Sequence, residues 1–165
     1  MNIPCRRTSP PYRKSELLKL PDLDVEPDSF HIKKSPMLVF IDMHDREGEE
    51  LIGKFCDLLT TKQVFGVPNE PKEYNNPETV LKDVYGHLEK LKLQGYYDFA
   101  SEIQKKMRIV VVGRDSVVNW ILGVICDLKL PESPSIAPIP LDEYNNGMGI
   151  SFGWVGRLAF IFNSF

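Results

Sequence analysis

Several features are scarce in this 165-residue chain, and each shortage argues against a class of protein. The three cysteines, Cys5, Cys56 and Cys126, stand too far apart to form the closely spaced ligand pairs of a zinc site. The net charge of −3 gives no electrostatic reason to expect nucleic-acid binding. No apolar run reaches the roughly 20 residues that a transmembrane helix needs, since the longest, at 150–162, contains Arg157. The N-terminus also lacks the apolar region of a secretory signal, so we expect a cytoplasmic protein.

What the chain does contain is the composition of one globular domain. Hydrophobic residues make up 42% of it and charged residues 26%, which is ordinary for a folded protein of this length. Residues 1–35 show little periodicity and are expected to form a flexible N-terminal segment. The folded domain is expected at 36–157, followed by an apolar tail at 158–165.

Apolar runs bounded by proline, glycine or polar turns predict four strands, at 36–41, 62–67, 109–113 and 136–141. The run at 109–113 has no polar alternation, which is typical of a central parallel strand covered on both faces. Proline cannot donate a hydrogen bond to a sheet, so we expect the strand at 136–141 either to lie at an edge or to be restricted to its last few residues.

Between these strands, apolar residues recur at steps of three and four, which predicts amphipathic helices. One helix carries Leu51, Phe55, Leu58 and Leu59 on its apolar face, and another is capped by Asn76. The resulting order, β-α-β-α-α-β-α-β, predicts a three-layer α/β fold with a mostly parallel sheet and helices on both faces.

The stretch 108–120 runs from a strand through a glycine turn into a helix, an arrangement that presents backbone N–H groups to a phosphate. In parallel sheets, ligands bind beyond the carboxyl ends of the strands. The loops at 42–48, 113–119 and 142–147 are therefore expected to converge on one crevice.

These loops and strands resemble the catalytic domain of plant diacylglycerol kinases, from about residue 36 to residue 154. The resemblance implies a fold like the N-terminal lobe of diacylglycerol kinases and NAD kinases. It also implies ATP and magnesium as cofactors, diacylglycerol as the acceptor, phosphatidic acid as a lipid-signalling product, and peripheral contact with membranes. The segments that carry it are 37–41, 62–65, 108–128, 136–141 and 151–154.

The resemblance assigns site residues by position. Gly113 and Asp115 match the first and third positions of the family's glycine-glycine-aspartate-glycine-threonine motif, and Asn145 and Asn146 match a second motif. By this match all four would bind the cofactor, and Asp115 is the candidate catalytic residue; no metal ligand is assigned. A helix N-cap is the alternative role for Asp115.

The chain also departs from the family motifs. Arg114, Ser116 and Val117 replace two glycines and the threonine, and arginine would add about 1–3 kcal/mol of strain if it kept a glycine conformation. Acidic residues of the neighbouring loops would repel a triphosphate. These changes predict a degenerate copy whose kinase activity is impaired or lost. We also expect a truncated copy, because the chain stops shortly after the nucleotide lobe of the family. The alternatives are a pseudokinase that binds a full-length kinase or another protein partner, and a nucleotide- or phosphate-binding module without catalysis.

Overall fold

The computed structural model describes residues 36–44, 46–68, 76–141, 147–151 and 153. The expected N-terminal segment and apolar tail lie outside these described residues. In chain order the elements are β1 (Met37–Asp42), α2 (Arg46–Leu58), β2 (Val64–Val67), α3 (Pro77–Leu93), α4 (Tyr97–Lys106), β3 (Arg108–Val112), α5 (Asp115–Leu128), β4 (Ser135–Ile139) and α6 (Gly147–Ser151).

The four strands form one parallel sheet in the order β2-β1-β3-β4. All four are the strands expected from the sequence, with bounds shifted by a few residues. Pro138 lies in β4, opposite Val111 of β3, and β4 is at the edge of the sheet as predicted. A proline is tolerated there because an edge strand has one side without a neighbour.

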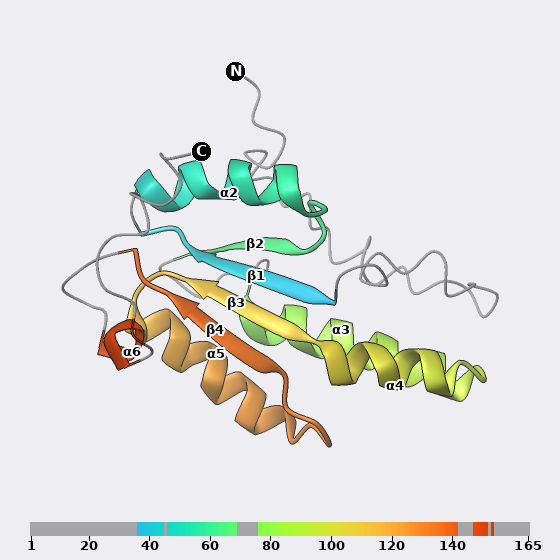
Figure 1. Cartoon of the computed structure of the whole chain (residues 1–165). Helices are drawn as coiled ribbons and strands as arrows, with labels where there is room; N and C mark the ends of the chain where they lie inside the picture. The colour runs from blue at the N-terminus through green and yellow to red at the C-terminus, as the bar shows by residue number, and fades with distance from the viewer. Residues whose placement is uncertain (1–35, 45, 69–75, 142–146, 152, 154–165) are drawn as a thin grey trace.

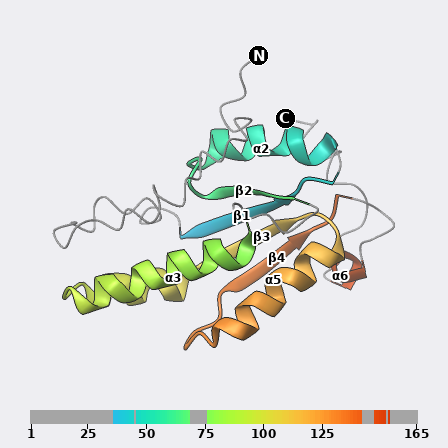
Figure 2. The ribbon, with the colours of Figure 1, turned by 180° about the vertical axis from the view of Figure 1, so that it is seen from behind.

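Helices cover both faces of the sheet, so the fold is the predicted three-layer α/β arrangement. α2 lies on one face, and α3, α4 and α5 lie on the other (Figure 1), as the view from behind also shows (Figure 2). Successive side chains of a strand point to opposite faces. Leu38 and Phe40 accordingly join the core cluster on the α3 to α5 side, whereas Val39 and Ile41 join the cluster on the α2 side.

The helix signals in the sequence are confirmed for α3 but only in part for α2. The side chain of Asn76 accepts a hydrogen bond from the backbone N–H of Glu78, and Pro77 opens α3 as expected. In α2, Leu51 is buried, but the expectation that Leu58 faces the core is wrong, because its side chain is 73% exposed. Leu58 is the last residue of α2, and the neighbouring Phe55 and Leu59 are the side chains that pack against the core on this face.

Within the described ranges, no helix combines the length and the apolar character needed to cross a membrane.

Candidate functional site

The connections between the strands indicate where a ligand crevice is expected, at the carboxyl ends of the strands. From β1 the chain moves to β2 on one side, and it then returns to place β3 on the other side of β1. Ligands of open parallel sheets bind where the direction of winding reverses in this way, beyond the carboxyl ends of the two central strands. Here that position lies between Asp42, the last residue of β1, and the turn at Gly113 and Arg114 after β3.

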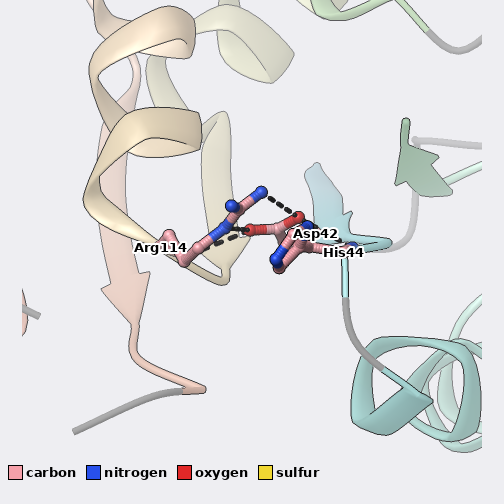
Figure 3. A network of polar contacts seen from close by, with 3 residues as sticks. All are labelled: Asp42, His44 and Arg114. Atoms are coloured by element: carbon pink, nitrogen blue, oxygen red, sulfur yellow. Dashed lines mark hydrogen bonds and ion pairs between the residues drawn. The ribbon is translucent and has the colours of Figure 1, made fainter. Parts of the chain in front are cut away.

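An ion pair between Asp42 and Arg114 spans this position (Figure 3). The Nε of Arg114 donates a hydrogen bond of 2.7 Å to Oδ2 of Asp42, and Nη2 donates one of 3.2 Å to Oδ1. The backbone N–H groups of Arg114 and His44 also donate to the carboxylate, at 3.3 and 3.0 Å. Asp42 is 3% exposed. These four hydrogen bonds compensate the carboxylate for its loss of water.

Two glycines make room for Asp42. A Cβ added to Gly113 would lie 2.3 Å from Cβ of Asp42, and a Cβ added to Gly48 would lie 2.0 Å from the backbone oxygen of Asp42. Gly113 also has a φ of 151°, which side-chain-bearing residues rarely adopt. The role of Gly113 seen here is thus the close approach of β3 to Asp42, and its assignment to cofactor binding stays a prediction.

The strain considered from the sequence does not arise at Arg114, because this residue does not adopt a glycine conformation. Its φ of −74° and ψ of 156° are those of extended backbone, because the positive φ of the turn falls on Gly113. Arg114 is the N-cap of α5 and makes no side-chain capping hydrogen bond. Its side chain bonds Asp42 instead.

Asp115 is the first residue of α5, but its carboxylate is hydrogen-bonded to a different helix, α6. Both of its oxygens accept a hydrogen bond of 3.3 Å from the backbone N–H of Met148 in α6. A Cβ added to Gly147 would lie 3.1 Å from Oδ2 of Asp115, so α6 begins directly against this carboxylate. The alternative role of Asp115 as the N-cap of α5 is therefore wrong, because Arg114 occupies the cap. Its catalytic role stays a prediction.

The other motif positions divide into those the structure describes and those outside it. Ser116 is exposed at the first turn of α5, whereas Val117 is 6% exposed and packs in the core. Asn145 and Asn146 lie outside the described residues, so their expected contact with the cofactor is not observed. Of the loops expected to converge, two meet where Asp42 contacts Arg114, and Gly147, the described residue of the third loop, lies next to the Asp115 carboxylate.

The Asp42–Arg114 pair does not fit the triphosphate of ATP in this arrangement. A carboxylate is placed where the anion would approach, and the nearest guanidinium is already bonded to that carboxylate. Within the described ranges, no group of three or more histidine, cysteine, aspartate or glutamate side chains could hold a metal ion. Sequence reasoning missed this pairing. The available signal was only that both residues stand where buried strands end, because the sequence does not show that these strands are neighbours in the sheet.

Comparisons with known proteins agree with the resemblance seen in the sequence. The chain is 43% identical over 122 residues to diacylglycerol kinase 5 of Arabidopsis thaliana, which covers 73% of this chain and 22% of that protein. It is 38% identical over 142 residues to diacylglycerol kinase 1 of Oryza sativa subsp. japonica, covering 82% of this chain and 27% of the relative. For diacylglycerol kinase 3 of Arabidopsis thaliana the identity is 33% over 135 residues, 79% of this chain and 26% of the relative.

No family model and no solved structure matches the chain. The match to the kinases is nevertheless consistent across several proteins, and the chain spans about a quarter of their length. With its parallel sheet and covering helices, this chain is therefore a member of the diacylglycerol kinase family that corresponds to part of those enzymes.

Proposed function

We propose that residues 36–157 form a nucleotide-lobe domain of the diacylglycerol kinase type, in which phosphate transfer by this chain alone is impaired or absent. The family reaction is the ATP- and magnesium-dependent phosphorylation of diacylglycerol to phosphatidic acid. Diacylglycerol is a membrane lipid, so the proposal includes a cytoplasmic protein that contacts membranes from one side. The observation that carries the impairment is the Asp42–Arg114 ion pair across the crevice.

The physical argument concerns the groups that a phosphate would meet there. Two like charges about 4 Å apart repel by about 4 kcal/mol at an effective dielectric constant near 20, so the Asp42 carboxylate opposes an incoming phosphate. Arg114 could offset this repulsion only by leaving Asp42, which would then be buried with fewer hydrogen bonds. Such a loss costs several kcal/mol for a buried ion.

The test measures nucleotide binding and lipid phosphorylation separately. Binding of magnesium ATP to the purified chain is measured by calorimetry, and transfer of labelled γ-phosphate is measured with diacylglycerol in mixed micelles. We expect no phosphatidic acid above background, and a dissociation constant weaker than about 1 mM. Formation of phosphatidic acid by the purified chain would contradict the proposal.

Variants connect the result to the ion pair. Replacing both partners, Asp42→Asn with Arg114→Gly, removes the carboxylate charge and restores glycine at the second motif position. We expect ATP affinity to rise at least about tenfold, which corresponds to about 1.4 kcal/mol. Lys106→Ala, which breaks an exposed ion pair with Glu102 on α4, is the matched control and should leave ATP affinity unchanged.

The same measurements separate the two alternatives. Tight ATP binding by the unaltered chain without lipid product would identify a non-catalytic nucleotide-binding module. If the chain and the double variant both fail to bind ATP, the result favours a pseudokinase that acts through a protein partner, such as a full-length kinase of the same family.

A further inference from the structure

A hollow lies near the amino ends of the strands, at the opposite end of the sheet from Asp42 and Arg114. It is a cavity of about 440 Å³ between α4 and the turn that connects α5 to β4, where the amino ends of β3 and β4 begin. The residues that matter for its chemistry are Lys92, Tyr97, Asp98, Ser101, Lys105 and Glu132. None of them belongs to the crevice between Asp42 and Arg114, so a role for this cavity is independent of the proposed function.

Part of the charge around this cavity is already paired within the protein. Nζ of Lys92 donates to Oε1 of Glu89 at 2.9 Å and to Oε1 of Gln104 at 2.6 Å, and it lies 5.6 Å from the centre of the Tyr97 ring. Glu102 is paired with Lys106. These lysines therefore do not make the cavity attractive to an anion.

The remaining charge is acidic. Asp98, Glu132 and Lys105 also line the cavity, and no ion pair with any described residue engages them. Their sum is one uncompensated negative charge, from two carboxylates and one ammonium group. The ring of Tyr97, which is 62% exposed, stands beside them. Carboxylates next to an exposed aromatic ring suit a cation, above all a planar guanidinium.

Two exposed apolar side chains lie at the turn between α3 and α4, next in the chain to Lys92 and Tyr97 of the cavity. Leu93 ends α3 with 89% of its side chain exposed, and Tyr96 precedes α4 with 36% exposed. Figures 1 and 2 both show this helical hairpin extending beyond the sheet. An exposed apolar patch beside a polar cavity is typical of a surface that binds another protein.

We infer that this cavity and the adjoining hairpin turn bind a segment of a partner protein in which an arginine side chain is flanked by apolar residues. The guanidinium enters the cavity against Asp98 and Glu132 and stacks on Tyr97, and the flanking apolar side chain covers Leu93. Charge complementarity selects this occupant. An anionic membrane would require an excess of basic residues, but the cavity is lined by fewer lysines than carboxylates. The lysines are Lys92 and Lys105, and the carboxylates are Asp98, Glu102 and Glu132.

The test uses short peptides and the whole chain. Acetylated, amidated Leu-Arg-Leu is titrated into the isotope-labelled chain, and backbone resonances are followed by NMR. The control peptide carries citrulline, a neutral isostere of arginine. We expect the arginine peptide to shift the resonances of Tyr97, Ser101 and Glu132, and the citrulline peptide to bind at least about threefold more weakly.

Variants then test the residues that carry the inference. Asp98→Asn combined with Glu132→Gln should weaken the arginine peptide at least about fivefold. Glu49→Gln, an exposed carboxylate of α2 on the other face of the sheet, should leave its affinity unchanged. All three positions are exposed, so the variants should keep the dispersed spectrum of the folded chain.

Several results would overturn the inference. Equal binding of the two peptides, equal binding by the double variant, or shifts confined to another face would each exclude an arginine site. Sedimentation of the chain with phosphatidylcholine vesicles that is lost in Leu93→Ser would assign the hairpin to a lipid surface instead. Concentration-dependent shifts of Leu93 and Tyr97 without peptide would assign it to a second copy of the chain.

Discussion

Arg114 and Asp42 are 72 residues apart in the chain, yet they are joined by two side-chain hydrogen bonds across the carboxyl ends of β3 and β1. The pair is asymmetric in burial, because the Asp42 side chain is 4% exposed and that of Arg114 is 24% exposed. Most of the desolvation cost therefore falls on the carboxylate. Removing the arginine leaves that cost without its main compensation.

Arg114→Ala should for this reason destabilise the fold. We expect a loss of about 2–3 kcal/mol in the free energy of unfolding, below the roughly 3–5 kcal/mol of a fully buried pair because Arg114 is partly exposed. Urea unfolding followed by circular dichroism measures it. Arg46→Ala removes an exposed pair with Glu50 and should cost less than about 0.5 kcal/mol. Equal effects of the two substitutions would show that the buried pair contributes nothing.

Gly113→Ala should be destabilising because its new methyl group has no space. The added Cβ would lie 2.3 Å from Cβ of Asp42, and the φ of 151° is unfavourable for alanine, so we expect a loss of at least about 2 kcal/mol in unfolding free energy. Gly86→Ala is the matched control within α3, where an added Cβ meets no atom within 4 Å. That change should stabilise the chain by about 0.5–1 kcal/mol. Thermal and urea unfolding check whether the two substitutions change the unfolding free energy in opposite directions.

Tyr85→Phe should stabilise the protein. The Tyr85 hydroxyl is buried, and no hydrogen-bond partner for it is found among the described residues. Removing an unsatisfied buried hydroxyl should raise the unfolding free energy by about 1 kcal/mol at pH 7. Tyr97→Phe, which removes an exposed hydroxyl, should be neutral. A loss of stability in Tyr85→Phe would show that the hydroxyl is hydrogen-bonded in solution.

The same tyrosine predicts a loss of stability at alkaline pH. Burial raises the pKa of Tyr85 to about 12, above its ordinary value of 10.0. Folding therefore favours the protonated phenol. The stabilisation that this preference adds to the free energy of unfolding is complete below about pH 10 and is lost as the pH rises toward 12. The unfolding free energy should fall less steeply over that range in Tyr85→Phe than in the unaltered chain, as measured by urea unfolding at each pH.

His87 predicts a loss of stability at acidic pH. Burial, followed by the nearby charge of Lys90, lowers the pKa of His87 from 6.5. The unfolded chain then binds a proton at a pH where the folded chain does not. The stabilisation that comes from neutral His87 is therefore fully present above about pH 6.5 and is lost as the pH drops toward the folded-state pKa. His87→Gln should reduce the loss of unfolding free energy between about pH 7.5 and pH 5.5. Lys90→Met should reduce it less, because burial is the larger cause; no difference between His87→Gln and the unaltered chain would contradict the prediction.

Local patterns were sufficient for most of the fold. Apolar periodicity, the Asn76 cap and Pro77 act within one or two turns of chain, so α3 could be located from its own residues. The continuous apolar run of β3 indicated a strand covered on both faces, because only burial on both sides makes such a run favourable. The position of β4 at an edge followed in the same way from Pro138, which lacks an N–H group.

The site required information that no local pattern contains. The sequence shows Asp42 as negative charge and Arg114 as bulk at a glycine position, but it does not show that they bind each other. Their pairing depends on β1 and β3 being neighbours in the sheet, and on Gly113 letting the strands approach. The contact of Asp115 with the backbone of Met148 has the same origin.

The sequence by itself thus determined the family, the order along the chain of the elements from β1 to β4, and most of the apolar faces, because these depend on short-range propensity and on burial of adjacent residues. The tertiary structure decided what the motif residues do. It placed Arg114 against Asp42 and Asp115 against α6, because hydrogen bonding and desolvation depend on which groups meet in space.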